Sequence, residues 1–60
     1  MKPGKNKGII LESSLKLFCS KGFGNTSIKE IAASAGVSQG NIYNYFSNKE
    51  EIFDELFFKK

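Results

Sequence analysis

The feature that most constrains this chain is a three-residue turn between two short segments of helical spacing. Gly36, Val37 and Ser38 separate these segments. Glycine adopts the left-handed backbone conformation that ends a helix, and serine is a good cap for the start of the next one. Two helices joined by so short a turn meet at roughly 90–120°, the geometry of the helix-turn-helix. The turn therefore favours a DNA-binding unit, although a small three- or four-helix bundle also needs short, capped helices.

Apolar periodicity and capping residues predict the helices around this turn. Apolar side chains recur about every 3.6 residues ahead of Gly22, which is expected to end the first helix. Ser27 and Glu30 have the spacing of a capping box, and Ser47 and Glu50 repeat it. The expected helices cover about residues 7–21, 27–35 and 38–45, and a fourth helix is expected to start near residue 48. No segment shows the alternation of a strand, so the expected fold class is all-α.

Size and composition exclude most other functions. The chain has 60 residues, nine Lys plus Arg against six Asp plus Glu, no His and a single cysteine, Cys19. One cysteine closes no intramolecular disulfide and, without His, builds no structural zinc site. Cys19 is expected to be a partly buried filler of the first helix. We expect no enzyme, no metal and no cofactor, because a general base of the commonest type and a walled pocket are both missing. No apolar run approaches the roughly 20 residues that cross a bilayer.

The segment after the turn has the composition of a surface that reads DNA bases. Residues 37–47 carry no charge, whereas Lys2, Lys5 and Lys7 give the first eight residues a local balance of +3. Base edges are read by neutral hydrogen-bonding side chains, and phosphates attract flanking cations. A solvated tail and an ordinary bundle helix are the plainer interpretations of these two stretches.

The same residues carry a family resemblance. The run that ends at Phe46, LF-x3-GF-x2-TSIKEIA-x2-AGVS-x-GNIYNYF, resembles the N-terminal DNA-binding domain of the tetracycline-repressor (TetR) family. The likeness extends outward to residue 9 and to Ile52. Ser13, Ser14, Gln39 and Asn41 depart from the residues usual in the family, which leaves the operator sequence open. The resemblance implies a three-helix, homeodomain-like helix-turn-helix domain plus the start of a fourth, connecting helix.

The resemblance also implies roles for individual residues. The helix over 38–45 would enter the major groove with its N-terminal end foremost. Gln39 would pair with adenine, Gly40 would allow close backbone approach, and Tyr43 would pack on a thymine methyl group or bond to phosphate. Asn41 would read a base or hold a phosphate. The remaining phosphate contacts would come from Ser27, Ser38, Asn44, Tyr45, Lys49, Lys5 and Lys7. The plainer alternatives are half-buried core positions for Tyr43 and Tyr45 and a solvated Lys49.

The expected organisation is a basic arm over 1–8, a DNA-binding domain over 9–47 and the start of a fourth helix over 48–60. In the family this helix leads to a C-terminal domain, absent here, that binds a small-molecule inducer and forms the homodimer. The implied partner is a near-palindromic double-stranded operator, and the implied location is the bacterial cytoplasm. The alternative is a cationic amphipathic module that binds a membrane or a partner protein. The acidic residues interspersed among the phenylalanines of the last helix disfavour it.

Overall fold

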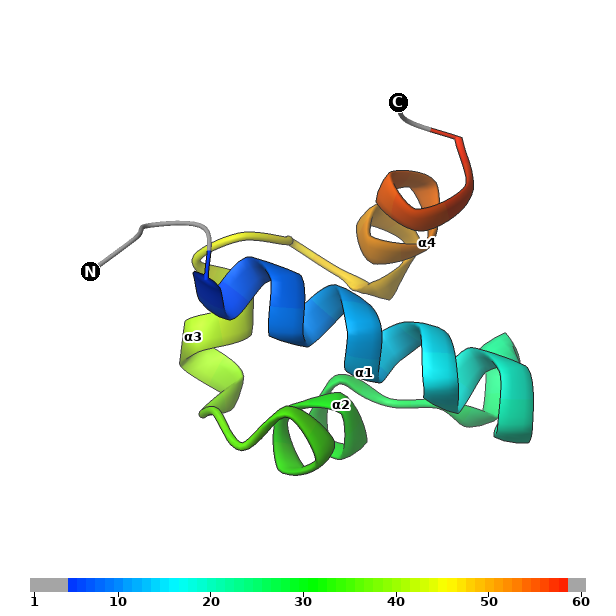
Figure 1. Ribbon diagram of the computed structural model, residues 1–60, viewed down its shortest axis with the longest axis horizontal. Coiled ribbons are helices and arrows are strands. Elements are labelled where there is room, and N and C mark those ends of the chain that lie inside the picture. Colours follow the sequence, from blue (N-terminus) through cyan, green and yellow to red (C-terminus); the bar gives the residue numbers. More distant parts are fainter. Residues whose placement is uncertain (1–4, 59–60) are drawn as a thin grey trace.

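The computed structural model describes residues 5–58, with only the backbone described at Lys5, and they form an all-helical unit (Figure 1). Its elements are α1 (Lys5–Lys21), the 3-10 helix η1 (Phe23–Asn25), α2 (Ile28–Ala35), α3 (Gln39–Tyr43) and α4 (Lys49–Phe57). Figure 1 shows α1 as the central axis, with α2 on one side and α4 on the other. No strand occurs among the described residues, so the predicted all-α class is confirmed.

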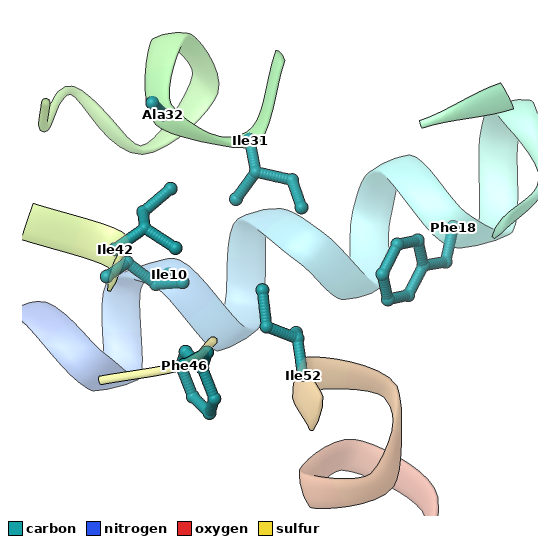
Figure 2. Close-up of a cluster of buried hydrophobic side chains, with 7 residues drawn as sticks. All are labelled: Ile10, Phe18, Ile31, Ala32, Ile42, Phe46 and Ile52. Carbon is teal, nitrogen blue, oxygen red and sulfur yellow. The ribbon is translucent and has the colours of Figure 1, made fainter. Parts of the chain in front are cut away.

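Each α-helix contributes one fully buried isoleucine to a shared core (Figure 2). These residues are Ile10, Ile31, Ile42 and Ile52, each with no exposed surface. Phe18, Ala32 and Phe46 complete the buried cluster. Full burial of one isoleucine stabilises a fold by about 1.5–3 kcal/mol, so these anchors give each helix a defined face toward the core.

The predicted turn between α2 and α3 is confirmed in detail. Gly36 caps α2 in the left-handed conformation, with φ 75° and ψ 29°. The N–H groups of Gly36 and Val37 both donate to the carbonyl oxygen of Ala32, at 2.9 and 3.0 Å. Ser38 then caps α3, because its Oγ accepts from the N–H of Asn41 at 3.0 Å. Val37 is partly buried against the core and thereby fixes the angle between the two helices.

One predicted capping box is confirmed and the other is wrong by one residue. In the first, Ser27 Oγ accepts from the N–H of Glu30, whose carboxylate accepts from the N–H of Ser27. In α4 the cap is Asn48 instead of Ser47, and its Oδ1 accepts from the N–H of Glu51 at 2.9 Å. Glu51 reaches back to the N–H of Ser47 at 2.7 Å. Asn and Ser cap almost equally well, so local sequence left both registers open.

The first helix starts earlier than predicted. α1 begins at Lys5, so residues 5–8 are helical and do not form an arm, while 1–4 lie outside the described residues. Long-range contacts hold this first turn. Asn6 donates to Asn41 at 3.3 Å, and the Lys7 ammonium lies 3.7 Å from the carboxylate of Glu55 and 5.8 Å from the centre of the Phe46 ring.

The third helix ends earlier than predicted, at Tyr43 instead of Tyr45. The N–H of Asn44 lies within hydrogen-bond distance of the carbonyl oxygens of both Gly40 and Asn41, and the N–H groups of Tyr45 and Phe46 share that of Ile42. This tightened last turn is the usual way in which a short helix satisfies its final carbonyl groups.

Two residues of α1, Ser14 and Cys19, differ in burial. Ser14, at a position where the resembling family usually has alanine, is fully buried, and its Oγ donates to the carbonyl oxygen of Ile10 at 2.7 Å. The hydroxyl group is therefore satisfied inside the helix, as is common for buried serine. The prediction for Cys19 is wrong, because its side chain is exposed. The neighbouring Phe18 takes the core position of that turn.

A cluster of phenylalanines joins α1, η1 and α4. Phe53 lies at its centre, with ring centroids 5.1 Å from Phe23, 6.1 Å from Phe18 and 4.6 Å from Phe57. Exposure grows outward along α4, from the fully buried Ile52 to Phe57 and Phe58, which are 49% and 70% exposed. The apolar face predicted for the fourth helix is thus only partly covered within the described residues.

Candidate nucleic-acid interface

The exposed face of α3 presents neutral polar groups. Gln39 and Gly40 are exposed, as is Tyr43 (51%), whereas Ile42 points into the core. Asn44, the C-terminal cap, is exposed as well. Tyr43 is absent from the core cluster and from the residues packed against it, so the alternative in which it is a core aromatic is wrong. Packing through Ile42 fixes the helix while its opposite face stays free for contact, as an element that inserts into a groove requires.

A shallow cleft of about 520 Å³ runs beside this face and joins three helices. It is bounded by the loop and first turn of α2, by the flank of α3 and by the first residue of α4. Four residues that the sequence placed at the DNA contact meet here: Ser27, Gln39, Tyr43 and Lys49. Residues from Ser27 to Lys49, which are 22 positions apart in the chain, thus form one surface that combines amide, hydroxyl and ammonium groups.

Lys49 has a structural role in this cleft. Its Nζ donates to the carbonyl oxygens of Phe23 at 2.6 Å and Thr26 at 2.8 Å, and lies 4.5 Å from the centre of the Phe23 ring. An ammonium group has three protons, so these bonds leave one for a further acceptor. The side chain is thus partly buried and internally bound, which differs from the solvated alternative.

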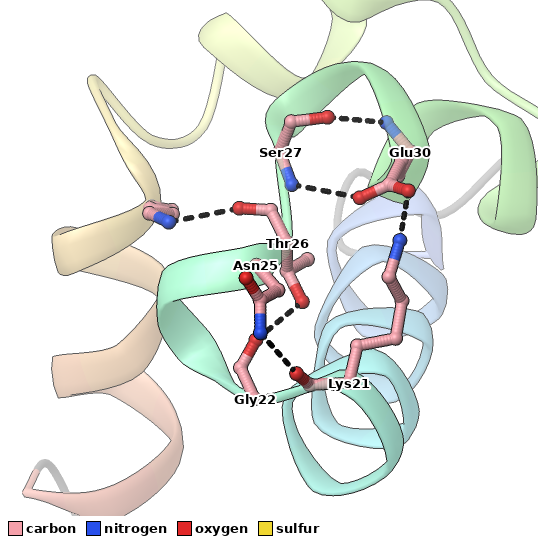
Figure 3. Close-up of polar contacts among 7 residues, drawn as sticks. Lys21, Gly22, Asn25, Thr26, Ser27 and Glu30 are labelled. Atoms are coloured by element: carbon pink, nitrogen blue, oxygen red, sulfur yellow. Dashed lines mark hydrogen bonds and ion pairs between the residues drawn. The ribbon is translucent and has the colours of Figure 1, made fainter.

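A polar network fixes the entrance to α2 (Figure 3). Glu30 forms an ion pair with Lys21 at the end of α1 and also accepts from the N–H of Ser27. Thr26, almost fully buried, donates its hydroxyl proton to the carbonyl oxygen of Gly22 at 2.9 Å. The Lys21 ammonium, followed by the N–H of Ser27, holds the pKa of the Glu30 carboxyl below its ordinary value. The Ser27 hydroxyl accepts from Glu30, so its own proton remains available at the cleft.

Lys29 is a cleft residue that the sequence interpretation did not name. It is exposed, lines the cleft and, among the described residues, makes no ion pair or side-chain hydrogen bond. It lies in the first turn of α2, where the helix dipole disfavours a cation. The sequence signal for Lys29 was its position in the first turn of a Ser-capped helix, where no described residue pairs with its charge.

Two other predicted residues, Tyr45 and Lys7, lie away from the cleft. Tyr45 is partly buried beside Phe46, with ring centroids 6.5 Å apart, as in the core alternative. Lys7 is paired with Glu55 of α4. Lys5 begins α1, and its side chain lies outside the described part of the structure. Of the phosphate contacts expected from the sequence, Ser27 and Lys49 are thus the ones that the cleft brings together with α3.

Asn41 lies on the flank of α3 that faces the first turn of α1. It is partly buried, and its Oδ1 accepts a hydrogen bond from Nδ2 of Asn6 at 3.3 Å. Its backbone N–H is held by Ser38. Asn41 is therefore separated from Gln39 and Tyr43, which lie on the cleft side of the same helix.

Other types of site have no support within residues 5–58. No group of three or more potential metal ligands occurs there. None of the helices in this range is long and apolar enough to cross a membrane.

Comparison with known proteins agrees with this geometry. Residues 10–56 match the family described as bacterial regulatory proteins, tetR family. The chain is 45% identical over 51 residues to the HTH-type transcriptional regulator YhgD of Bacillus subtilis, covering 85% of this chain and 27% of that protein. It is 38% identical over 50 residues to the HTH-type transcriptional repressor KstR2 of Mycobacterium tuberculosis, covering 83% and 25%. It is also 45% identical over 47 residues to the HTH-type transcriptional regulator AcrR of Shigella flexneri, covering 78% and 22%.

The chain thus spans roughly a quarter of the length of these relatives. No solved structure is similar enough to count as a match.

Proposed function

The chain belongs to the tetR family of bacterial regulatory proteins, and from that premise we propose that it binds double-stranded DNA in a sequence-specific manner through α3. The observation that carries this proposal is the cleft, in which the neutral face of α3 adjoins two lysines and the capped start of α2. Neutral amides read bases and cations hold phosphates, so this one surface supplies both kinds of contact.

In the proposed complex, α3 enters the major groove with its N-terminal turn foremost. Gln39 pairs with adenine through its amide, Gly40 allows the backbone to approach the bases, and Tyr43 packs on a thymine methyl group. The Ser27 hydroxyl, Lys29 and the third proton of Lys49 hold the phosphates on the cleft side. Ser38 and Asn44 lie at the two ends of α3 and contact the backbone there.

We further propose that the full-length protein acts as a ligand-responsive dimer, most simply as a repressor of transcription. KstR2 carries the word repressor in its name, which supports this direction of control. A dimer would place two copies of α3 about one helical turn apart on a near-palindromic operator. The inducer and dimer contacts would lie outside these 60 residues, and the protein would work in the bacterial cytoplasm.

Salt dependence tests the electrostatic part of this proposal. If Lys29 and Lys49 each neutralise one phosphate, affinity for a duplex should fall at least about tenfold between 50 and 200 mM salt. Fluorescence anisotropy of the 60-residue chain with a labelled duplex measures this. Affinity that is equal at both salt concentrations would contradict the proposed phosphate contacts.

Selection from a randomised duplex library tests the base contacts. Gln39→Ala should change the preferred base at particular positions, whereas Lys29→Ala should weaken binding to all sequences alike. Lys29 is a cleaner control than Lys49, because its removal breaks no internal hydrogen bond. Identical sequence preferences for wild type and Gln39→Ala would refute the role given to Gln39.

A further inference from the structure

A single hydrogen bond connects the first turn of α1 to the recognition helix. Nδ2 of Asn6 donates to Oδ1 of Asn41 at 3.3 Å, between residues 35 apart in the chain. The contact is partly buried, so water competes with it less than at an open surface. Among the described residues, this bond joins a side chain of α1 directly to a side chain of α3.

In the structure this bond engages the oxygen end of the Asn41 amide. A carboxamide has one end that accepts and one that donates. With Oδ1 turned to Asn6, the NH2 group is the unengaged end, and no described residue accepts a hydrogen bond from it. The backbone beneath is fixed by the Ser38 cap and by the fully buried Ile42, so reversal of the amide requires rotation of the side chain alone.

We propose that Asn6 is a positioning residue that makes Asn41 a hydrogen-bond donor toward the DNA bases. This inference rests on the proposed function, in which α3 lies in the major groove. It assigns a part in sequence selection to a residue of α1 that itself contacts no base. It also limits how Asn41 could read a base, because bidentate pairing with adenine needs a free amide oxygen.

The donor assignment predicts a definite base preference. In the major groove guanine presents the acceptors N7 and O6, and thymine presents O4, whereas cytosine presents only the donor N4 amino group. An outward NH2 group therefore favours guanine or thymine over cytosine at the base that Asn41 meets. An outward Oδ1 reverses this preference toward cytosine or adenine.

Asn6→Asp tests the assignment, because aspartate accepts but does not donate. The Asn41 amide must then turn over to donate to the new carboxylate, which leaves its oxygen toward the DNA. Selection from a randomised duplex library at low salt should show guanine or thymine for the wild type and cytosine or adenine for Asn6→Asp at one position. The expected change in the ratio of the two preferences is on the order of fivefold or more, the effect of about one hydrogen bond. The immobilised 60-residue chain suits this assay, because high surface density offsets weak monomer affinity.

Two further variants control for charge and for loss of the contact. Asn44→Asp adds the same charge at an exposed position at the end of α3, and should lower affinity for all sequences without altering that position. Asn6→Leu removes the bond without adding charge and should relax the preference by freeing the amide. Circular dichroism confirms that each variant is folded before selection.

The outcomes separate this inference from the function on which it rests. A wild type that shows no sequence preference would contradict the proposed function itself. A wild type with a clear preference that Asn6→Asp leaves unchanged would overturn the role of Asn6 alone. Weaker binding to all sequences by Asn6→Asp, with no change at any base, would also overturn it, because Asn41 would then contact phosphate.

Discussion

Lys49 offers the sharpest test of how this domain combines stability with DNA contact. The family resemblance implies a phosphate contact at this position, yet here its ammonium group is bound to the carbonyl oxygens of Phe23 and Thr26. Lys49→Met keeps most of the side-chain volume and removes the charge. The substitution therefore leaves two partly buried carbonyl groups without their donor and removes the contact with the Phe23 ring.

The size of the loss follows from these contacts. A hydrogen bond to a charged group contributes about 1.5–3 kcal/mol, and a cation–π contact at an exposed site about 0.5–1 kcal/mol. Water can reach both carbonyl groups in the open cleft and restores part of this, so we expect a net loss of about 2–3 kcal/mol. For a domain of this size such a loss lowers Tm by about 10–20 °C.

Thermal and urea unfolding, followed by circular dichroism, measure the change. Lys29→Met is the matched control, because it removes the same charge from the same cleft without breaking a hydrogen bond. We expect its stability to stay within about 0.5 kcal/mol of the wild type while its DNA affinity falls. If Lys49→Met were as stable as Lys29→Met, the two carbonyl contacts would contribute nothing, and the structural role of Lys49 would be refuted.

Three further predictions follow from the described contacts. Gly40→Ala should raise the free energy of unfolding by about 0.5 kcal/mol, because the added Cβ meets only Ser38 Oγ, at 3.9 Å, inside the protein. The same Cβ should weaken duplex binding, and unchanged affinity in anisotropy titrations would show that no DNA approaches there. The pKa of Glu30 is lowered on folding, so its ion pair stabilises the fold above its unfolded-state pKa, and this contribution is lost as the pH falls below 4.5 through the folded-state value. Urea titrations across this range should show a shallower loss for Glu30→Gln, and parallel curves would contradict the assignment. Ile52→Ala should destabilise the domain by about 2–5 kcal/mol, since the side chain is fully buried, and a smaller change in urea unfolding would mean that α4 is dispensable to the core.

The parts of the fold that were predicted correctly are those encoded by neighbouring residues. The Ser27 capping box and the Gly36 turn each depend on side chains within four positions of one another, so local chemistry identified them. The cap of α4 was misplaced because Ser47 and Asn48 are adjacent and equally suitable. The choice between them depends on which register brings Ile52 into the core, and that is a tertiary property.

The early start of α1 and the role of Lys49 lay beyond prediction for a related reason. Asn6 finds its partner 35 residues away, and Lys49 finds its carbonyl groups 23 and 26 residues away. A lysine at the start of a helix looks the same in the sequence whether it faces phosphate or the protein's own backbone. Lys29 could not be identified from the sequence, because its place beside Gln39 and Tyr43 depends on how the second and third helices pack.

The meeting of four isoleucines, one from each α-helix, has a consequence for how this domain opens. The buried side chains of all four α-helices form one shared cluster. The α3 helix has only five residues, which is too short for a helix that is stable alone. Protected amide protons in all four helices should therefore exchange with solvent through one shared global opening, without independent subregions. The DNA-contacting surface would then exist only while the whole unit is folded, and partial loss of structure would leave no residual recognition.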